Sequence, residues 1–286
     1  MGVKLRPGTA GDADACGRIC YEAFASIAAA HGYPCDFPSV DVATGLVASL
    51  LAKPGIFSVV AEAGGEVVGS NFLDERATIA GVGPITVAPA TQDGAVGRRL
   101  MVAVLDRAAE RGAAGVRLVQ TAYHTRSLSL YAKLGFVARE PLACLQGPPL
   151  RSAVPGRAVR PAAAGDFDAC NALCRAVHGH DRAPQLADAI AAGTALVVER
   201  DGGRVSGYST GLSFFAHSVG ETVDDLEAMI GAAPGFAGPG VLVPIRNGPL
   251  FRWCLEHGLR VVQLMTLMTT GLYNEPAGAW LPSVMY

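Results

Sequence analysis

An internal repeat limits the fold of this chain more than any other feature. Residues 5–20 read LRPGTAGDADACGRIC and residues 159–174 read VRPAAAGDFDACNALC, with most identities at one constant spacing. A spacing shared over so many positions predicts two copies of one fold, and 286 residues are enough for two domains with a core each. The predicted domains are 1–146 and 157–286, joined by the Pro- and Gly-rich linker QGPPLRSAVPGR at 146–157.

Apolar runs and chain breakers give the order of elements in the first copy. Strands are predicted at 3–6, 56–62, 66–73, 83–87, 116–121 and from 136 onward. Helices are predicted at 10–30, 40–51, 96–111 and 127–134. This order predicts a mixed α/β fold, in which each of two similar domains is a central mixed twisted sheet flanked by helices.

Composition and charge exclude several classes of protein. The formal net charge is −2 and the basic residues are scattered, so no surface for nucleic acid is expected. No apolar run approaches the roughly 18 residues needed to cross a bilayer, and the N-terminus MGVKLRPG has no apolar leader. Seven cysteines without a leader are expected to be reduced thiols. We therefore expect a cytoplasmic protein with no membrane and no nucleic-acid partner.

Two groups of residues resemble metal ligands, but neither is complete. Cys16 and Cys20, like Cys170 and Cys174, are four residues apart on a predicted helix. No second ligand pair accompanies them, and free cysteine is among the most buried residue types. The run His178–Gly179–His180–Asp181 falls short of the three or four ligands that a metal site needs. No metal is expected.

Only the first copy carries the turn QDGAVGRR at 92–99, which leads from a predicted strand into a predicted helix. Backbone N–H groups at a helix start point toward one place, and the helix dipole adds positive potential there. An anion such as a pyrophosphate is favoured at such a place, because the small residues 94, 95 and 97 leave room for it. The alternative is a plain turn whose glycines allow tight packing.

A second segment, HTRSLSLYAKLGF at 124–136, follows about thirty residues later. Together with VAPATQDGAVGRRLM at 87–101, it resembles the GNAT acyltransferase family, in which these motifs bind coenzyme A and place a tyrosine near the coenzyme sulfur. The resemblance covers about residues 3–145. It departs from the family pattern at Ala95, where a glycine is usual, and at His124, where an asparagine is usual.

The resemblance implies roles for individual residues. Tyr131 would be the general acid that protonates the departing thiolate. Asp74 and Glu75, just after the third strand, are candidates for accepting the amine proton, or else they are solvated turn residues. His31 and Tyr33 are further candidates for lining the acceptor cleft, with the alternative that His31 is a surface loop histidine. The residues implied for acetyl-CoA are Ile85, Thr86, Val87, Gln92, Asp93, Gly94, Ala95, Val96, Gly97, Arg98 and His124.

The second copy is predicted to lack a coenzyme site. Residues 244–252 align with 89–97, which puts Leu250 and Arg252 in place of small residues, while Pro249 has no N–H to donate. This degenerate copy would bury an apolar face of the first domain, complete the acceptor pocket or make a dimer contact.

The expected function is that of an acetyl-CoA-dependent N-acetyltransferase. It would transfer an acetyl group to a primary amine of a small-molecule or peptide acceptor, by direct attack in a ternary complex. The alternative is a non-catalytic acyl-CoA-binding sensor or interaction module. The sequence leaves open the acceptor, the general base, the acyl-chain preference and the formation of a homodimer.

Overall fold

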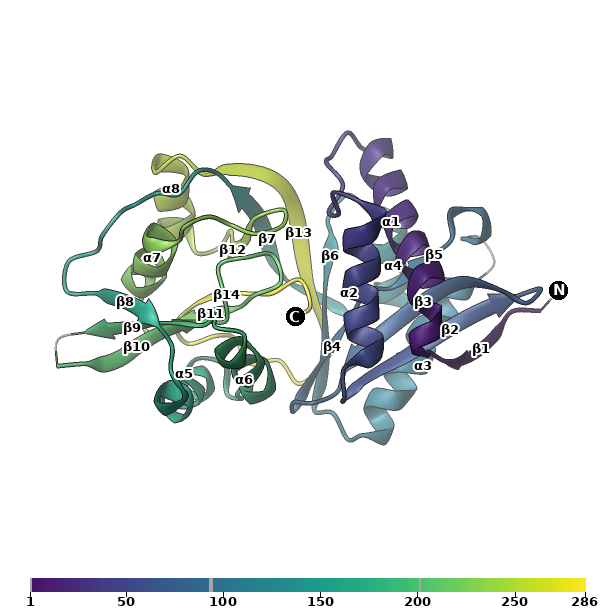
Figure 1. Cartoon of the computed structure of the whole chain (residues 1–286), viewed down its shortest axis with the longest axis horizontal. Helices are drawn as coiled ribbons and strands as arrows, with labels where there is room; N and C mark the ends of the chain where they lie inside the picture. The colour runs from purple at the N-terminus through teal and green to yellow at the C-terminus, as the bar shows by residue number, and fades with distance from the viewer. Residues whose placement is uncertain (1, 93–94, 201) are drawn as a thin grey trace.

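The computed structural model describes residues 2–92, 95–200 and 202–286, which form two sheets flanked by helices (Figure 1). The first half contains β1 Lys4–Pro7, α1 Ala13–Ala30, α2 Val40–Ala52, β2 Ile56–Ala63, β3 Glu66–Asp74, β4 Ile79–Val82, β5 Thr86–Val87, α3 Val96–Glu110, β6 Gly115–Thr121, α4 Thr125–Lys133 and β7 Val137–Gln146. The second half contains β8 Ala158–Pro161, α5 Phe167–His178, α6 Ala183–Ala191, β9 Leu196–Arg200, β10 Arg204–Ser209, β11 Ser218–Gly220, α7 Val223–Ala232, β12 Val241–Pro244, α8 Gly248–Glu256, β13 Arg260–Gly271 and β14 Ala279–Leu281. The predicted mixed α/β fold is confirmed.

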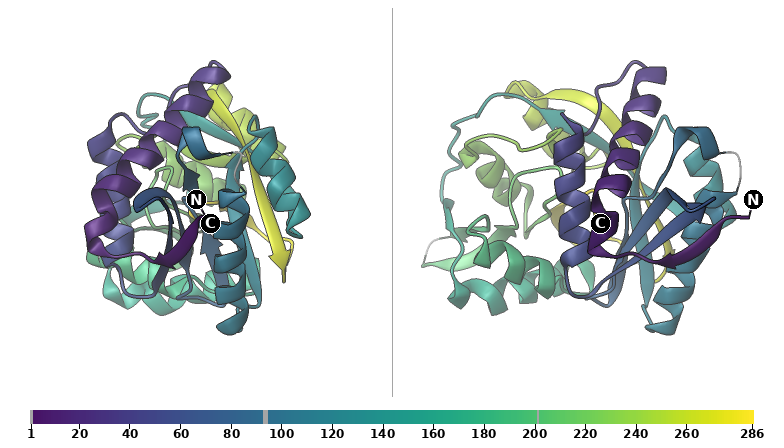
Figure 2. Two further views of the ribbon diagram at one scale, coloured as in Figure 1. Left: turned by 90° about the vertical axis from the view of Figure 1, so that its right-hand side faces the viewer. Right: turned by 45° about the vertical axis from the view of Figure 1, so that its right-hand side comes forward.

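Helices cover both faces of the first-half sheet because its strands place apolar side chains on both sides. Val60 of β2 and Phe72 of β3 pack in the cluster formed with α1 and α2. Their neighbours Val59 and Ala61 pack in the cluster formed with α3 and α4. The left view of Figure 2 shows α1 and α2 on one side of this sheet and α4 on the other.

The paired cysteines of α1 and α5 are core residues. Cys16, Cys20, Cys170 and Cys174 are fully buried in apolar clusters. Burial raises the pKa of Cys20 to about 12, so its thiol stays protonated and unreactive. Among the described residues, no three His, Cys, Asp or Glu side chains are grouped so that they could hold a metal ion. No helix in the described parts of the chain is long and apolar enough to span a membrane.

An exchange of strands joins the two halves. The repeated element order makes β6, α4 and β7 the counterparts of β12, α8 and β13. However, β6 pairs with β13, β12 pairs with β7, and β13 also pairs with β7, all antiparallel. The resulting sheet has the order β1-β2-β3-β4-β6-β13-β7-β12. In Figure 1 the long β13 runs along the boundary between the two halves. The predicted domains 1–146 and 157–286 therefore share one sheet.

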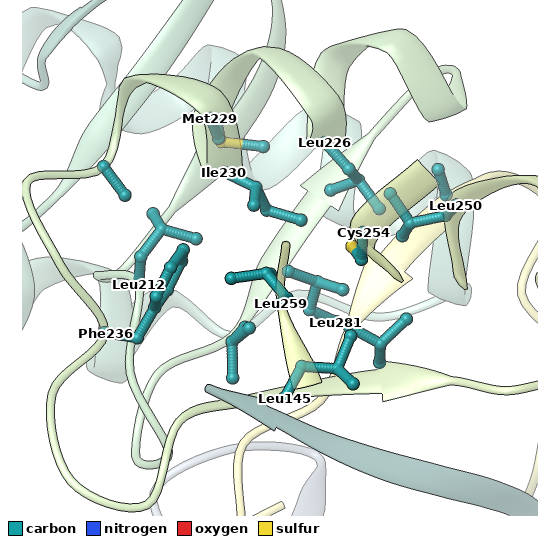
Figure 3. Packing of buried hydrophobic residues seen from close by; sticks show 14 of the residues in the cluster. Leu145, Leu212, Leu226, Met229, Ile230, Phe236, Leu250, Cys254, Leu259 and Leu281 are labelled. Atoms are coloured by element: carbon teal, nitrogen blue, oxygen red, sulfur yellow. The ribbon is translucent and has the colours of Figure 1, made fainter. Parts of the chain in front are cut away.

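The strand β7 also forms part of the second-half core. Leu145 of β7 packs in one cluster with Leu226 and Met229 of α7 and with Leu250 of α8 (Figure 3). These four side chains are completely buried, and each fully buried Leu or Met stabilises the fold by about 2 kcal/mol. Without β7 of the first half, apolar side chains of the second-half core would therefore be exposed to water.

The structure corrects the alignment predicted for the second copy. Because the elements recur in the same order, α7 is the counterpart of α3, whereas residues 244–252 lead from β12 into α8, the counterpart of α4. Pro249, Leu250 and Arg252 therefore do not replace the coenzyme turn. The prediction compared sequence letters across segments of unequal length and missed the helix at 223–232.

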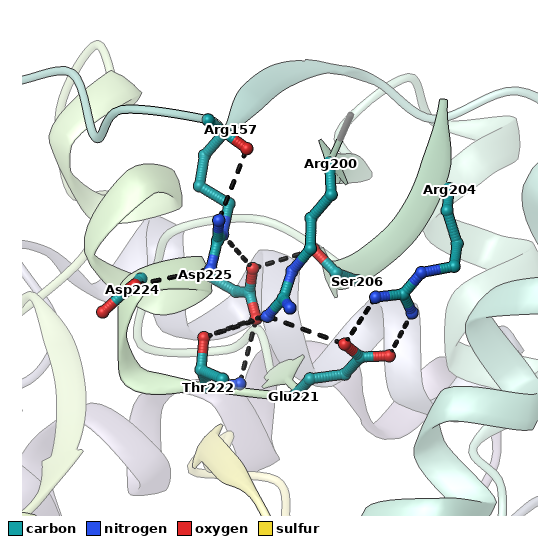
Figure 4. Close-up of polar contacts among 9 residues, drawn as sticks. Arg157, Arg200, Arg204, Ser206, Glu221, Thr222, Asp224 and Asp225 are labelled. Atoms are coloured by element: carbon teal, nitrogen blue, oxygen red, sulfur yellow. Dashed lines mark hydrogen bonds and ion pairs between the residues drawn. The ribbon is translucent and has the colours of Figure 1, made fainter. Parts of the chain in front are cut away.

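At the start of α7, the carboxylate of Asp225 occupies the place where the first copy has its turn. It accepts hydrogen bonds from the Thr222 backbone N–H at 2.9 Å, from Arg157 Nε at 2.7 Å and from Arg200 Nη2 at 3.0 Å (Figure 4). An acidic side chain satisfies a helix start in the same way as a bound anion does. In the second half the helix start is therefore satisfied by an internal carboxylate.

Candidate active site

A cavity of about 320 Å³ lies where the strands β4–β5 and β6 part. β4 pairs in parallel with β6 only as far as Gly81 and Arg117, and β5 then pairs with β3 instead. Residues 82–87 and 118–121 line the cavity beyond this point. Because these two segments do not form a ladder with each other, their backbone polar groups are available to a ligand between them.

Gly69 of β3 explains how β5 is held away from β6. A Cβ atom at Gly69 would lie 2.6 Å from the carbonyl oxygen of Thr86, which is closer than real contacts allow. Only glycine therefore lets β5 approach β3 at this position. This local requirement keeps the gap between β5 and β6 open.

The start of α3 forms one end of the cavity. Ala95 precedes the helix in the left-handed conformation with φ 59°, and its own side chain makes no capping hydrogen bond to the helix. Gln92 Nε2 donates to the carbonyl of Val87 at 3.3 Å, which ties the turn to the end of β5. The uncapped N–H groups and the helix dipole favour an anion here, and Arg98 also lines the cavity.

Most residues implied for the coenzyme line this cavity. They are Ile85, Thr86, Val87, Gln92, Ala95, Gly97, Arg98 and His124. The side chain of Val96, the first residue of α3, instead packs in the core, with only 1 % exposed, and anchors the helix to the sheet. Asp93 and Gly94 lie outside the described residues.

Tyr131 lines the cavity from α4 and is otherwise buried. Burial raises the pKa of Tyr131 to about 12, and a hydrogen bond with Ser127 acts in the opposite direction. Ser127 also contacts His124, with 2.8 Å between Ser127 Oγ and His124 Nδ1. Burial lowers the pKa of His124, so at neutral pH this imidazole is uncharged. The phenol is therefore a protonated group that can give a proton.

The structure does not bring Asp74 and Glu75 into the cavity. Asp74 Oδ2 lies 2.7 Å from Arg76 Nη2, and Glu75 Oε2 lies 2.7 Å from Arg107 Nε. At Asp74 burial opposes ionisation, but the hydrogen bonds from Arg76 prevail and lower its pKa. The hydrogen bonds from Arg107 lower the pKa of Glu75. Both carboxylates are paired with guanidinium groups and neither is among the residues that line the cavity, which favours the alternative that they are not the base.

His31 and Tyr33 do not line the cavity either. The Tyr33 ring stacks on Tyr123 at a centroid distance of 4.4 Å, and the His31 ring lies 5.2 Å from the same tyrosine. Both rings therefore contact the residue that directly precedes His124. His31 also contributes, after burial and Arg126, to the lowered pKa of His124.

The carboxylate that lines the cavity is that of Asp36, which the sequence analysis missed. It lies between α1 and α2, and Gln263 Nε2 of β13 donates to its Oδ1 at 2.9 Å. Burial raises the pKa of Asp36 to about 6, with the Gln263 hydrogen bond acting in the opposite direction. Its place in the breaker-rich segment between Pro34 and Pro38 was the one signal that could have drawn attention to it.

The far end of the cavity is apolar and is completed by the second half. Phe24 and Phe37 come from the first half, and Phe214, Phe215, Met265, Val284 and Met285 come from the second half. Gly81 allows the tail to approach, since a Cβ there would lie 2.5 Å from the carbonyl oxygen of Met285. The tail is anchored by Tyr286, whose hydroxyl lies 2.6 Å from Arg117 Nη1 and 2.8 Å from His180 Nε2.

Comparisons with known proteins agree with this geometry. The family model described as Acetyltransferase (GNAT) family matches residues 25–136. A search of curated proteins found no match. A Pyrococcus horikoshii protein described as an acetyltransferase has a similar structure, with a TM-score of 0.73 and 17% identity over 98% of this chain and 94% of that one.

Two further solved structures cover both halves. A GCN5-related N-acetyltransferase from Sphaerobacter thermophilus has a TM-score of 0.59 and 16% identity, over 95% of this chain and 96% of that one. A tandem GNAT protein from the clavulanic acid biosynthesis pathway has a TM-score of 0.56 and 17% identity, over 99% of this chain and 100% of that one. Residues 25–136 therefore match the GNAT acetyltransferase family, and the chain has the fold of tandem GNAT proteins along its whole length.

Proposed function

We propose that this protein transfers the acetyl group of acetyl-CoA to a primary amine by direct attack in a ternary complex. The observation that carries the proposal is one continuous cavity, which joins the uncapped start of α3, the parted strands, Tyr131 and an apolar end. A coenzyme and an acceptor can therefore meet without a covalent enzyme intermediate. None of the seven cysteines lines this cavity.

The residues present fit the coenzyme. The N–H groups at the start of α3, together with Arg98 and Arg126, would hold the pyrophosphate at one end of the cavity. The backbone of residues 82–87 would hydrogen-bond the amide groups of the pantetheine arm, because this segment has no ladder with β6. The thioester carried by this arm supplies the activated acetyl group.

Tyr131 would complete the reaction. The amine nitrogen bonds to the thioester carbon, the carbon–sulfur bond breaks, and the Tyr131 hydroxyl gives its proton to the departing sulfur. A phenol with a pKa of about 12 remains protonated at pH 7 and is available as the acid. A non-catalytic acyl-CoA sensor would not need a buried phenol at this place.

Binding of acetyl-CoA to a Gly97→Glu variant tests the site by isothermal calorimetry. A Cβ at Gly97 would lie 3.7 Å from Leu130 and 3.8 Å from Val87, so the variant should fold, while its carboxylate repels phosphate. We expect affinity to fall at least about 100-fold. The control is Gly45→Glu, an exposed helical glycine whose Cβ has nothing within 4 Å. Equal binding by both variants would contradict the site.

The Tyr131→Phe variant separates binding from turnover in the same assay. It should bind acetyl-CoA as the parent does, because the ring remains in the core, and it should lose about 100-fold or more in kcat. Release of free thiol in the presence of an amine measures the rate. Unchanged turnover would remove the tyrosine from the reaction, and binding without turnover of any amine by the parent would favour a sensor.

A further inference from the structure

The acceptor end of the cavity contains a carboxylate without a cation. Asp36 has one hydrogen-bond partner among the described side chains, the amide of Gln263. The titratable groups around it are the thiols of Cys20, Cys35 and Cys144 and the phenol of Tyr123. All are neutral at pH 7, since burial raises the pKa of each of them. A buried carboxylate in neutral surroundings is expected to bind a cation.

A second group in the same cavity lacks a partner. Gln120 of β6 is buried, with 6 % exposed, and lines the cavity. Neither its amide oxygen nor its amide nitrogen has a hydrogen-bond partner among the described residues. Leaving such a group unpaired costs about 1–3 kcal/mol. An amide that can both donate and accept is therefore ready for a neutral polar group of a ligand.

The remaining walls of this end are apolar. Phe24, Phe37, Phe214, Phe215 and Met265 line the same cavity as these two polar residues. A second charge on the acceptor would lose its hydration here without compensation, because Asp36 is the one carboxylate that lines the cavity within the described residues. Aromatic and long aliphatic bodies fit such walls, whereas polyamines and acidic peptides do not.

We propose that the acceptor is a primary amine on a single apolar body, whose nitrogen is bound and deprotonated by Asp36 and whose neutral hydroxyl or amide group is bound by Gln120. This inference rests on the proposed function and adds the class of acceptor and the base. Gln263, which comes from β13, is a positioning residue because it acts through Asp36.

The proposed transfer conserves protons. The lone pair of the neutral amine forms the nitrogen–carbon bond, one N–H proton passes to the Asp36 carboxylate, and the sulfur receives the proton of Tyr131. Asp36 then returns its proton to the Tyr131 phenolate through solvent. An acceptor that arrives as an ammonium ion first gives one further proton to solvent.

The test uses the full chain with acetyl-CoA and three amines: tyramine, 2-phenylethylamine and putrescine. We expect both aromatic amines to be acetylated with kcat/KM at least about 10-fold above that of putrescine, since its second ammonium has no partner. Asp36→Asn should lose about 100-fold or more in kcat/KM and keep the affinity for acetyl-CoA. The control is Asp41→Asn, an exposed aspartate at the start of α2, which should match the parent.

Gln120→Leu isolates the second contact. It should raise KM for tyramine about 10-fold and lower KM for 2-phenylethylamine, because only tyramine carries a hydroxyl group that can pair with the amide, and leucine removes the cost of leaving that amide unpaired. The acidic limb of the pH profile of kcat/KM near pH 6 should be present in the parent and absent in Asp36→Asn. The base assignment would be overturned by an Asp36→Asn variant with the parent's rate and profile.

The outcomes separate this inference from the proposed function. Preference for putrescine, or acetyl-CoA binding without transfer to either aromatic amine, would overturn the acceptor class and leave the coenzyme site intact. A parent protein that does not bind acetyl-CoA would instead overturn the proposed function, and this inference with it. Transfer to the aromatic amines with loss in Asp36→Asn supports both.

Discussion

At the scale of single residues, the surroundings of each carboxylate decide which one can serve as a base. Asp74 and Glu75 each lie against an arginine, which keeps their pKa low and their carboxylates occupied. Asp36 has an amide partner and apolar surroundings, and its pKa is raised to about 6. A base with a pKa near the working pH is effective in proton transfer, so burial creates a property that the aspartate lacks in water.

The same burial predicts that Asp36 destabilises the folded protein at neutral pH. Its pKa is raised in the fold, so the fold binds more protons than the unfolded chain between about pH 4 and pH 6, and stability falls as pH rises through this range. Asp36→Asn should therefore increase the free energy of unfolding at pH 8 by roughly 1–3 kcal/mol, which raises Tm. At pH 4 the substitution should leave both quantities unchanged. Thermal unfolding at both pH values measures this. A lower Tm at pH 8 would contradict it.

At the scale of elements, the equivalent helices α3 and α7 differ in how their first turns are satisfied. The start of α3 has no capping side chain at Ala95, and Ala95 and Gly97 line the cavity. The start of α7 is closed by the completely buried Asp225, which Arg157 and Arg200 neutralise. The family's fold is therefore kept in both halves, while an anion can be accepted at one helix start and is replaced by an internal carboxylate at the other.

Two neighbouring aspartates test the importance of this internal carboxylate. Asp225→Ala leaves Arg157 and Arg200 without their buried partner and should cost about 3–5 kcal/mol in stability. Asp224→Ala should cost less than about 0.5 kcal/mol, because Asp224 has 59% of its side chain exposed and lies 3.4 Å from Arg157. Hydrogen bonds from Ser206 and Arg200 overcome burial and lower the pKa of Asp225. The difference, measured by urea unfolding at pH 7, should therefore shrink as pH falls below about 4.

At the scale of the whole molecule, the two halves are built as one unit. β13 lies between β6 and β7, and β7 adds to β12. The acceptor end of the cavity takes residues from both halves, and Gln263 of the second half holds Asp36 of the first. Stability and function therefore depend on the same strand exchange.

This unity predicts that a ligand of one half stabilises the other. Trp253 of α8 and Trp280 of β14 are the two tryptophans, and both lie in the second half. Acetyl-CoA at about 100 times its Kd should raise the Tm reported by tryptophan fluorescence, since binding adds about 2.7 kcal/mol to a cooperative unit. Separate unfolding of two domains would leave this fluorescence transition unmoved.

Much of the first half could be predicted because its signals are local. The periods of apolar residues and the breakers placed its helices within a few residues, and β4 was the strand that was missed. Its four residues, IAGV, carry too short a pattern to separate a strand from a loop. The turn at 92–99 and Tyr131 could also be recognised from short segments. In the structure, Tyr131 and four described residues of the turn line one cavity: Gln92, Ala95, Gly97 and Arg98.

The sequence by itself determined the repeat, the fold class and the position of a Gly-rich turn before a helix, followed by a tyrosine-bearing segment, since each is a pattern of residues that are close together in the chain. Only the tertiary structure decided which strands pair and which carboxylate faces the acceptor. β7 and β13 are both long strands with buried residues, so pattern alone cannot tell which of them pairs with β6. Asp36 meets Gln263 across 227 residues, and that contact exists only because the strands are exchanged.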